Sequence, residues 1–152
     1  MKFSKSIIVV AILSLTFFAC KKKSEDQTKL DTEIIQKYLQ DNSLVADTSG
    51  GIYYVISDTG TVTHPTATSI VTVYYKGYLT NGTAFDQNIP GLPREFSLQG
   101  VIKGWQIGLP LIGKGGKIKL LIPSALGYGT KTTGSIPANS VLIFDIELST
   151  FR

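Results

Sequence analysis

The residues in this chain that could do chemistry are mainly aromatic, because the usual nucleophiles and metal ligands are scarce. The sequence contains one histidine, His64, and one cysteine, Cys20. It therefore offers neither a Cys-His dyad nor a cluster of soft metal ligands. His64 precedes a proline and is typical of a surface loop, and no Gly-x-Ser-x-Gly motif supports a serine nucleophile. We expect no metal and no cofactor.

Two other kinds of site are also disfavoured. Residues 113–117 (GKGGK) lack the four-residue spacing and the Ser/Thr of a phosphate-binding loop, and they lead into a strand, so we interpret them as a turn. The net charge is +4, but Lys2 and Lys5 lie in a segment that we expect to be removed. Without them the chain has 13 basic and 11 acidic residues, and this nearly balanced charge predicts no nucleic-acid surface.

The aromatic side chains are the remaining candidates. Residues 100–105 (GVIKGW) hold the single tryptophan, Trp105, beside the adjacent apolar residues Val101 and Ile102. This segment is too short for an independent helix and too apolar for an idle loop, so we expect it to form the floor of an apolar pocket. Further aromatic residues could line the same pocket, although for each alone a place in the core is the simpler interpretation: Tyr75, Tyr78, Phe85, Phe96, Tyr128 and Phe144.

The elements that must position these residues follow from hydrophobic periodicity. Leu30, Ile34 and Tyr38 fall at helical spacing, which predicts a helix over residues 28–42. Five segments have the alternation or β-branched content of strands: residues 52–56, 69–80, 95–98, 117–122 and 141–149. We expect an antiparallel sheet of about five or six strands with one polar face and a short helix over the other, which is an α+β fold.

The N-terminus predicts export and anchoring. A basic start, an apolar run and the sequence Phe-Phe-Ala before Cys20 resemble a bacterial lipoprotein signal. We expect residues 1–19 to be a signal peptide and residues 20–29 to be the lipidated Cys20 with a polar tether. The protein would then be lipid-anchored to a bacterial membrane, facing the periplasm or the cell exterior. The alternative is an ordinary secreted protein with a free thiol.

Four ordered blocks carry a more specific signal. They are residues 73–86 (VYYKGYLTNGTAFD), 96–105 (FSLQGVIKGW), 122–129 (IPSALGYG) and 136–148 (IPANSVLIFDIEL). Together they resemble the FKBP family of peptidyl-prolyl cis-trans isomerases. The resemblance implies an FKBP-like antiparallel sheet wrapped around a short α-helix, formed by residues 51–152. Residues 30–50 would be an N-terminal helical extension.

The resemblance also implies roles for individual residues. Trp105 would be the floor under the proline ring, Tyr128 would donate to a substrate carbonyl, and the backbone N–H of Ile102 would meet another carbonyl. Asp86 would be the buried polar group that orients the ligand. The implied catalytic residues are Tyr75, Phe85, Asp86, Tyr128 and Phe144, and the implied substrate-binding residues are Phe96, Val101, Ile102, Trp105 and Ile136.

Some positions depart from the family pattern. Gly127 stands where the family often has alanine, and Arg94 lies near the place of a second pocket phenylalanine. These departures bear on macrolide affinity and substrate preference more than on the reaction.

The implied activity needs no nucleophile. Rotation about the planar amide has a barrier of ~18–20 kcal/mol, and an apolar pocket favours the twisted, less polar amide over the planar one. The implied partners are proline-containing, unfolded or partly folded client polypeptides, with macrolide inhibitors as candidate ligands and the bilayer bound through Cys20. Two alternatives stay open: a membrane-anchored chaperone or peptide-binding module with little isomerase activity, and a structural lipoprotein whose aromatics are only core.

Overall fold

A computed structural model describes residues 25–152 of the chain. The predicted signal peptide and Cys20 lie outside the described residues. The division of the chain at residues 19, 29 and 50 stays a prediction. The structure differs from this division in one place. Residues 25–29, which we expected in the tether, already belong to a helix that runs over residues 25–41.

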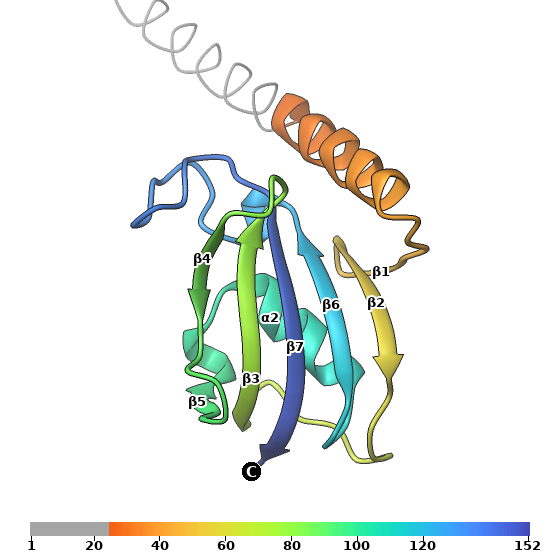
Figure 1. Ribbon diagram of the computed structural model, residues 1–152, viewed down its shortest axis with the longest axis vertical. Helices are drawn as coiled ribbons and strands as arrows, with labels where there is room; N and C mark the ends of the chain where they lie inside the picture. The colour runs from red at the N-terminus through yellow and green to blue at the C-terminus, as the bar shows by residue number, and fades with distance from the viewer. Residues whose placement is uncertain (1–24) are drawn as a thin grey trace, which may run out of the picture.

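The centre of the fold is one antiparallel sheet of seven strands (Figure 1). The strand order is β1-β2-β6-β7-β3-β4, and β5 also pairs with β3. The strands are β1 (Asp47–Ser49), β2 (Ile52–Asp58), β3 (Ile70–Leu79), β4 (Ala84–Gln87), β5 (Arg94–Ser97), β6 (Lys117–Ile122) and β7 (Leu142–Phe151). The antiparallel α+β architecture is confirmed. β1 and β4 were not predicted, since their sequences, DTS and AFDQ, hold neither a run of β-branched residues nor a clear apolar alternation.

The inner face of the sheet is covered by α2 (Lys103–Gly108), the short helix that carries Trp105 (Figure 1). Gly104 and Gly108 allow this contact: a Cβ on Gly104 would collide with Ile122, and one on Gly108 would lie 2.5 Å from Leu120. The helix therefore rests directly on β6. The 3₁₀ turns η1 (Leu98–Gly100) and η2 (Leu109–Leu111) lie on either side of α2, and η3 (Ser124–Leu126) follows β6.

The main core lies between α2 and the sheet. Alternate residues of β7 point into it, as the sequence predicted, and Val71, Val73 and Tyr75 of β3 join them. The fully buried side chains include Ile52, Leu98, Leu109, Ile112, Leu120, Ile122, Leu142 and Leu148.

The N-terminal helix (residues 25–41) packs on the opposite face, where Ile35 and Leu39 meet Leu121 and Val141 in a second, smaller core. The prediction that this face is polar is therefore wrong at this end of the sheet. The buried stripe of the helix runs through Asp31, Ile35 and Leu39. Ile35 and Leu39 widen the predicted apolar stripe, whereas Leu30 and Ile34 at its centre are exposed. No helix among residues 25–152 is long and apolar enough to cross a membrane.

Candidate active site

The site is built around Trp105, whose ring is 4% exposed. Three aromatic rings meet it edge to face: Tyr75 and Phe96 with ring centroids 5.4 Å away, and Phe144 at 5.3 Å. Phe85 meets Phe144 in the same manner at 5.5 Å. Such pairs stabilise one another by ~0.5–1.5 kcal/mol beyond area burial, so the rings form a stiff wall.

These rings enclose a cavity of about 240 Å³ that opens to solvent. It is lined by Tyr75, Phe85, Asp86, Phe96, Gly100, Val101, Ile102, Trp105, Tyr128 and Phe144. The structure thus brings together nine of the ten residues expected in the pocket, from β3, β4, β5, β7, α2, the segment before α2 and the loop after η3. Ile136 is the exception, since it is 5% exposed and packs in the core without lining the cavity. The roles of the individual residues stay predictions.

A polar chain runs along one rim of this cavity. The Tyr75 hydroxyl donates to a carboxylate oxygen of Asp86 at 2.7 Å, and the Arg94 guanidinium donates to the same hydroxyl at 2.8 Å. Burial, and then the neighbouring carboxylate, raise the pKa of Tyr75 to about 12, so this phenol stays neutral. The Asp86 side chain is 53% exposed, which corrects the expectation that it is buried.

Two donors face the cavity without a partner in the described part of the chain. Tyr128 is 38% exposed, and its hydroxyl makes no hydrogen bond to any residue of 25–152. Burial, followed by the charge of Asp86, raises the pKa of Tyr128, which keeps the hydroxyl protonated. The backbone N–H of Ile102, just before α2, likewise has no acceptor within these residues. Both groups are free to donate to carbonyls of a bound peptide.

Sequence reasoning missed two residues that shape the pocket. Gly77 lies in the middle of β3, where a Cβ would come within 2.5 Å of Phe85 and 2.7 Å of Phe144. A glycine inside a predicted strand signals such a close approach and could have revealed it. Arg94 was predicted only to be a departure from the family pattern. It lies over the Phe96 ring at 5.3 Å, and so it covers part of the aromatic wall with a cation.

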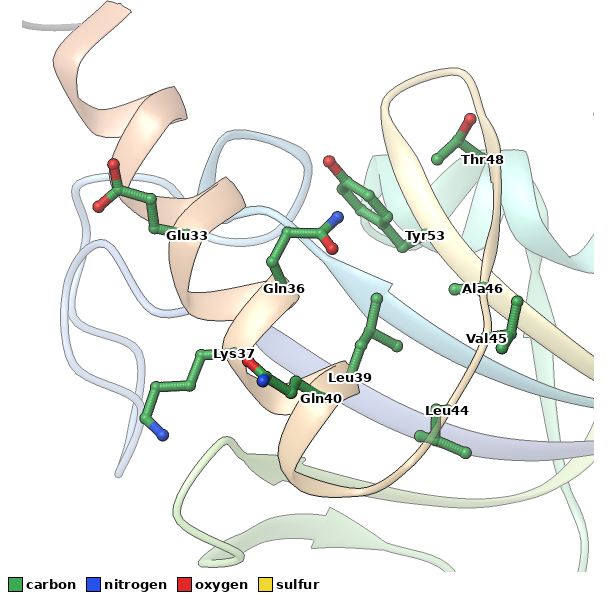
Figure 2. A pocket seen from close by; sticks show the side chains of 10 residues that line it. All are labelled: Glu33, Gln36, Lys37, Leu39, Gln40, Leu44, Val45, Ala46, Thr48 and Tyr53. Atoms are coloured by element: carbon green, nitrogen blue, oxygen red, sulfur yellow. The ribbon is translucent and has the colours of Figure 1, made fainter.

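A larger hollow of about 860 Å³ lies elsewhere, between the N-terminal helix and the segment that leads through β1 (Figure 2). Its lining is mostly polar and charged on the helix side, with Glu33, Gln36, Lys37 and Gln40. It has a single aromatic residue, Tyr53, and so lacks the enclosed aromatic wall of the Trp105 cavity. Within residues 25–152 no cluster of three or more His, Cys, Asp or Glu side chains could hold a metal ion.

A short helix laid across an antiparallel sheet, with a tryptophan-floored aromatic cavity between them, is the arrangement of an FKBP-type isomerase domain. The comparisons agree: residues 61–149 match the model of the FKBP-type peptidyl-prolyl cis-trans isomerase family, which is more than half of the chain. The chain belongs to this family.

Individual relatives are similar over most of the chain. FKBP-type peptidyl-prolyl cis-trans isomerase FkpA of Buchnera aphidicola subsp. Schizaphis graminum is 46% identical over 129 residues, which are 84% of this chain and 51% of that protein. FkpA of Escherichia coli strain K12 is 38% identical over 146 residues, or 89% of this chain and 54% of the relative. The chain thus spans about half the length of these curated relatives.

Solved structures show the same fold. The crystal structure of Escherichia coli FkpA superimposes with a TM-score of 0.70 at 34% identity, covering 99% of this chain and 74% of that one. A peptidyl-prolyl cis-trans isomerase from Pseudomonas syringae pv. tomato gives 0.72 at 31% identity, covering 84% and 95%. The predicted family and fold are confirmed.

Proposed function

We propose that this protein is a peptidyl-prolyl cis-trans isomerase that assists the folding of exported polypeptides. The observation that carries the proposal is the cavity over Trp105, walled by Tyr75, Phe96 and Phe144 and rimmed by two free donors. Its volume of about 240 Å³ suits a proline ring and part of its neighbours. Family membership supports the same activity.

The reaction would proceed by binding alone. A planar X-Pro amide is polar because its nitrogen lone pair is delocalised, and it exchanges isomers over ~tens to hundreds of seconds unaided. Twisting removes this delocalisation, so an apolar wall favours the twisted form over the planar one. The rings of Trp105, Phe85 and Phe144 would supply this dry wall.

The rim would hold the peptide in place. Tyr128 and the Ile102 N–H would donate to carbonyls on either side of the proline, while the Tyr75 hydroxyl is already occupied by Asp86. Each step is non-covalent and moves no proton. The partners would be unfolded or partly folded clients that expose proline.

The decisive experiment follows cis-to-trans conversion of a proline tetrapeptide with the purified protein. We expect acceleration that is proportional to enzyme concentration, and loss of most of it in Phe85→Ala while the fold is retained by circular dichroism. A folded wild type that leaves the spontaneous rate unchanged would refute the isomerase proposal. Peptide binding without acceleration would favour the chaperone or clamp alternative.

A second proposal concerns how strongly the same cavity binds macrolide inhibitors. Arg94 covers part of the aromatic wall with charge, which disfavours a large apolar ligand. We therefore expect weaker inhibition by macrolides in the wild type than in Arg94→Leu. Equal inhibition of the two proteins in the tetrapeptide assay would contradict this assignment.

Anchoring is proposed from the sequence of the leader. The apolar run before Cys20 supports export, and acylation of Cys20 would fix the protein to a bacterial membrane, facing the periplasm or the cell exterior. Metabolic labelling with a radioactive fatty acid, followed by membrane fractionation, tests this. We expect label and membrane association in the wild type and neither in Cys20→Ser; an unlabelled, soluble wild type would refute it.

A further inference from the structure

A buried carboxylate links the N-terminal helix to the loop that carries Tyr128. Asp31 lies on the sheet-facing side of the helix and is 1% exposed. One of its oxygens accepts two hydrogen bonds from Ser124, from the backbone N–H at 2.8 Å and from the hydroxyl at 2.6 Å. The other oxygen accepts from the Gln27 amide at 2.8 Å.

This carboxylate has an unusual environment. None of the ion pairs found among residues 25–152 includes Asp31, so within this part of the chain its oxygens are satisfied by hydrogen bonds. Burying a carboxylate without a cation is costly unless its hydrogen bonds are good, and a residue such as leucine would continue the apolar stripe formed by Ile35 and Leu39. Asp31 therefore provides hydrogen bonds to Ser124 that an apolar residue at this position could not make.

Ser124 connects Asp31 to the backbone on either side of Tyr128. It begins η3 and is 2% exposed. Its carbonyl accepts hydrogen bonds from Gly127 at 3.0 Å and from Gly129 at 2.8 Å, the two residues on either side of Tyr128. The carbonyl of Gly129 is held in turn by the N–H of Asn139 at 2.8 Å.

The Tyr128 ring depends on this backbone for its position. Its hydroxyl makes no hydrogen bond within the described chain, and it is more than a third exposed. With no hydrogen bond to hold the hydroxyl within residues 25–152, the position of the ring depends on the loop backbone between Ser124 and Gly129. Catalysis by positioning is sensitive to small displacements, since an error of ~1 Å can cost ~10²-fold in rate.

We propose that Asp31 is a positioning residue for the isomerase, which fixes the Tyr128 loop from the N-terminal helix through its two hydrogen bonds to Ser124. This inference rests on the proposed function, because it assigns to Tyr128 a contact with the substrate. It makes the N-terminal helix part of the catalytic unit rather than a spacer.

The test is a double-mutant cycle on the whole protein with the proline tetrapeptide assay. Asp31→Ala is expected to lower kcat/KM by about 3- to 10-fold, the scale of one or two lost hydrogen bonds. Combined with Tyr128→Phe, it is expected to lower kcat/KM little further, since both changes act through the same contact. Effects that multiply in the double variant would overturn the proposal.

Milder and control variants separate positioning from stability. Ser124→Ala removes the hydroxyl and keeps the backbone N–H, and Asp31→Leu removes both acceptor oxygens while continuing the apolar stripe of the helix; both keep the test usable if Asp31→Ala does not fold. Asp41→Ala is the matched control, since Asp41 lies on the exposed side of the same helix and, among residues 25–152, pairs only with Lys37. A lower melting temperature in Asp31→Leu with unchanged kcat/KM would assign Asp31 a structural role and refute the inference.

Hydrogen exchange gives a readout that does not depend on activity. The amides of Gly127 and Gly129 are expected to exchange faster in Asp31→Leu than in the wild type, while those of β7 keep their protection. Unchanged exchange at both glycines would overturn the proposal. An inactive wild type that still shows this change would refute the isomerase function and leave the link between helix and loop established.

Discussion

At the scale of single residues, the pocket separates groups that are already occupied from groups that are free. Tyr75 is occupied, because its hydroxyl lies between Asp86 and Arg94. Tyr128 and the Ile102 N–H are free to meet a ligand. A family motif conveys which residue types are present, but only the hydrogen bonds show which of two similar tyrosines can contact a peptide.

Tyr128→Phe is expected to lower kcat/KM by about 2- to 10-fold, because one neutral hydrogen bond contributes ~0.5–1.5 kcal/mol. The fold should be unaffected, since this hydroxyl has no partner among residues 25–152. Tetrapeptide kinetics and thermal unfolding measure the two effects. An unchanged kcat/KM would remove Tyr128 from the contact with substrate.

The neutral phenols also predict how the protein responds to pH. The pKa of Tyr75 is raised to about 12, above the ordinary 10.0, so its contribution to stability is complete below pH 10 and is lost as pH rises from 10 to 12. Isomerase activity should therefore be flat from pH 6 to 9. The difference titration at 295 nm between wild type and Tyr75→Phe should rise near pH 12; a rise near pH 10 would contradict the assignment.

At the scale of elements, glycines decide how closely the layers approach. Gly104 and Gly108 bring α2 onto β6, and Gly77 leaves room for two pocket rings above β3. The two glycines of residues 100–105 differ in their surroundings. Gly104 serves the contact between helix and sheet, whereas Gly100 lines the cavity and has open space around it.

Gly77→Ala is expected to lower the free energy of unfolding by about 1–3 kcal/mol, because the new methyl group displaces Phe85 and Phe144. Activity should fall as well, since both rings wall the cavity. Gly100→Ala is the matched control for stability, since nothing lies within 4 Å of a Cβ at that position. Urea unfolding compares the two variants, and equal stabilities would show that Gly77 is not needed for close packing.

How far the sequence predicts this molecule depends on the range of the interactions. β7 was predicted well, because its alternate residues face one core along ten positions. The pocket residues were predicted through four motifs that the family holds in order. The burial of Asp31 could not be predicted, since its partner Ser124 lies 93 positions away and a polar residue on a helix is normally exposed.

At the scale of the whole molecule, the two faces of the sheet are covered by different helices. The inner face holds α2 and the cavity, while the outer face carries the N-terminal helix at one end (Figure 1). Because Ile35 and Leu39 share a core with β6, the helix should unfold together with the sheet.

Ile35→Ala is expected to lower the free energy of unfolding by about 2–5 kcal/mol, because it leaves a cavity under the helix. Its neighbour gives a matched control: Ile34 is 40% exposed, so Ile34→Ala should change stability by no more than about 0.5 kcal/mol. Denaturant unfolding followed by circular dichroism and by tryptophan fluorescence should give coincident curves. A separate early transition of the helix would contradict this.

The strand order has a consequence for synthesis. β7, the last of the seven described strands in chain order, lies between β6 and β3 and brings Phe144 to the cavity. Nascent chains that end before β7 leave β3 and β6 without the strand that joins them. A chain in which β7 has not yet been made therefore lacks the Phe144 wall of the cavity over Trp105 and leaves the apolar strands β3 and β6 unpaired along one edge.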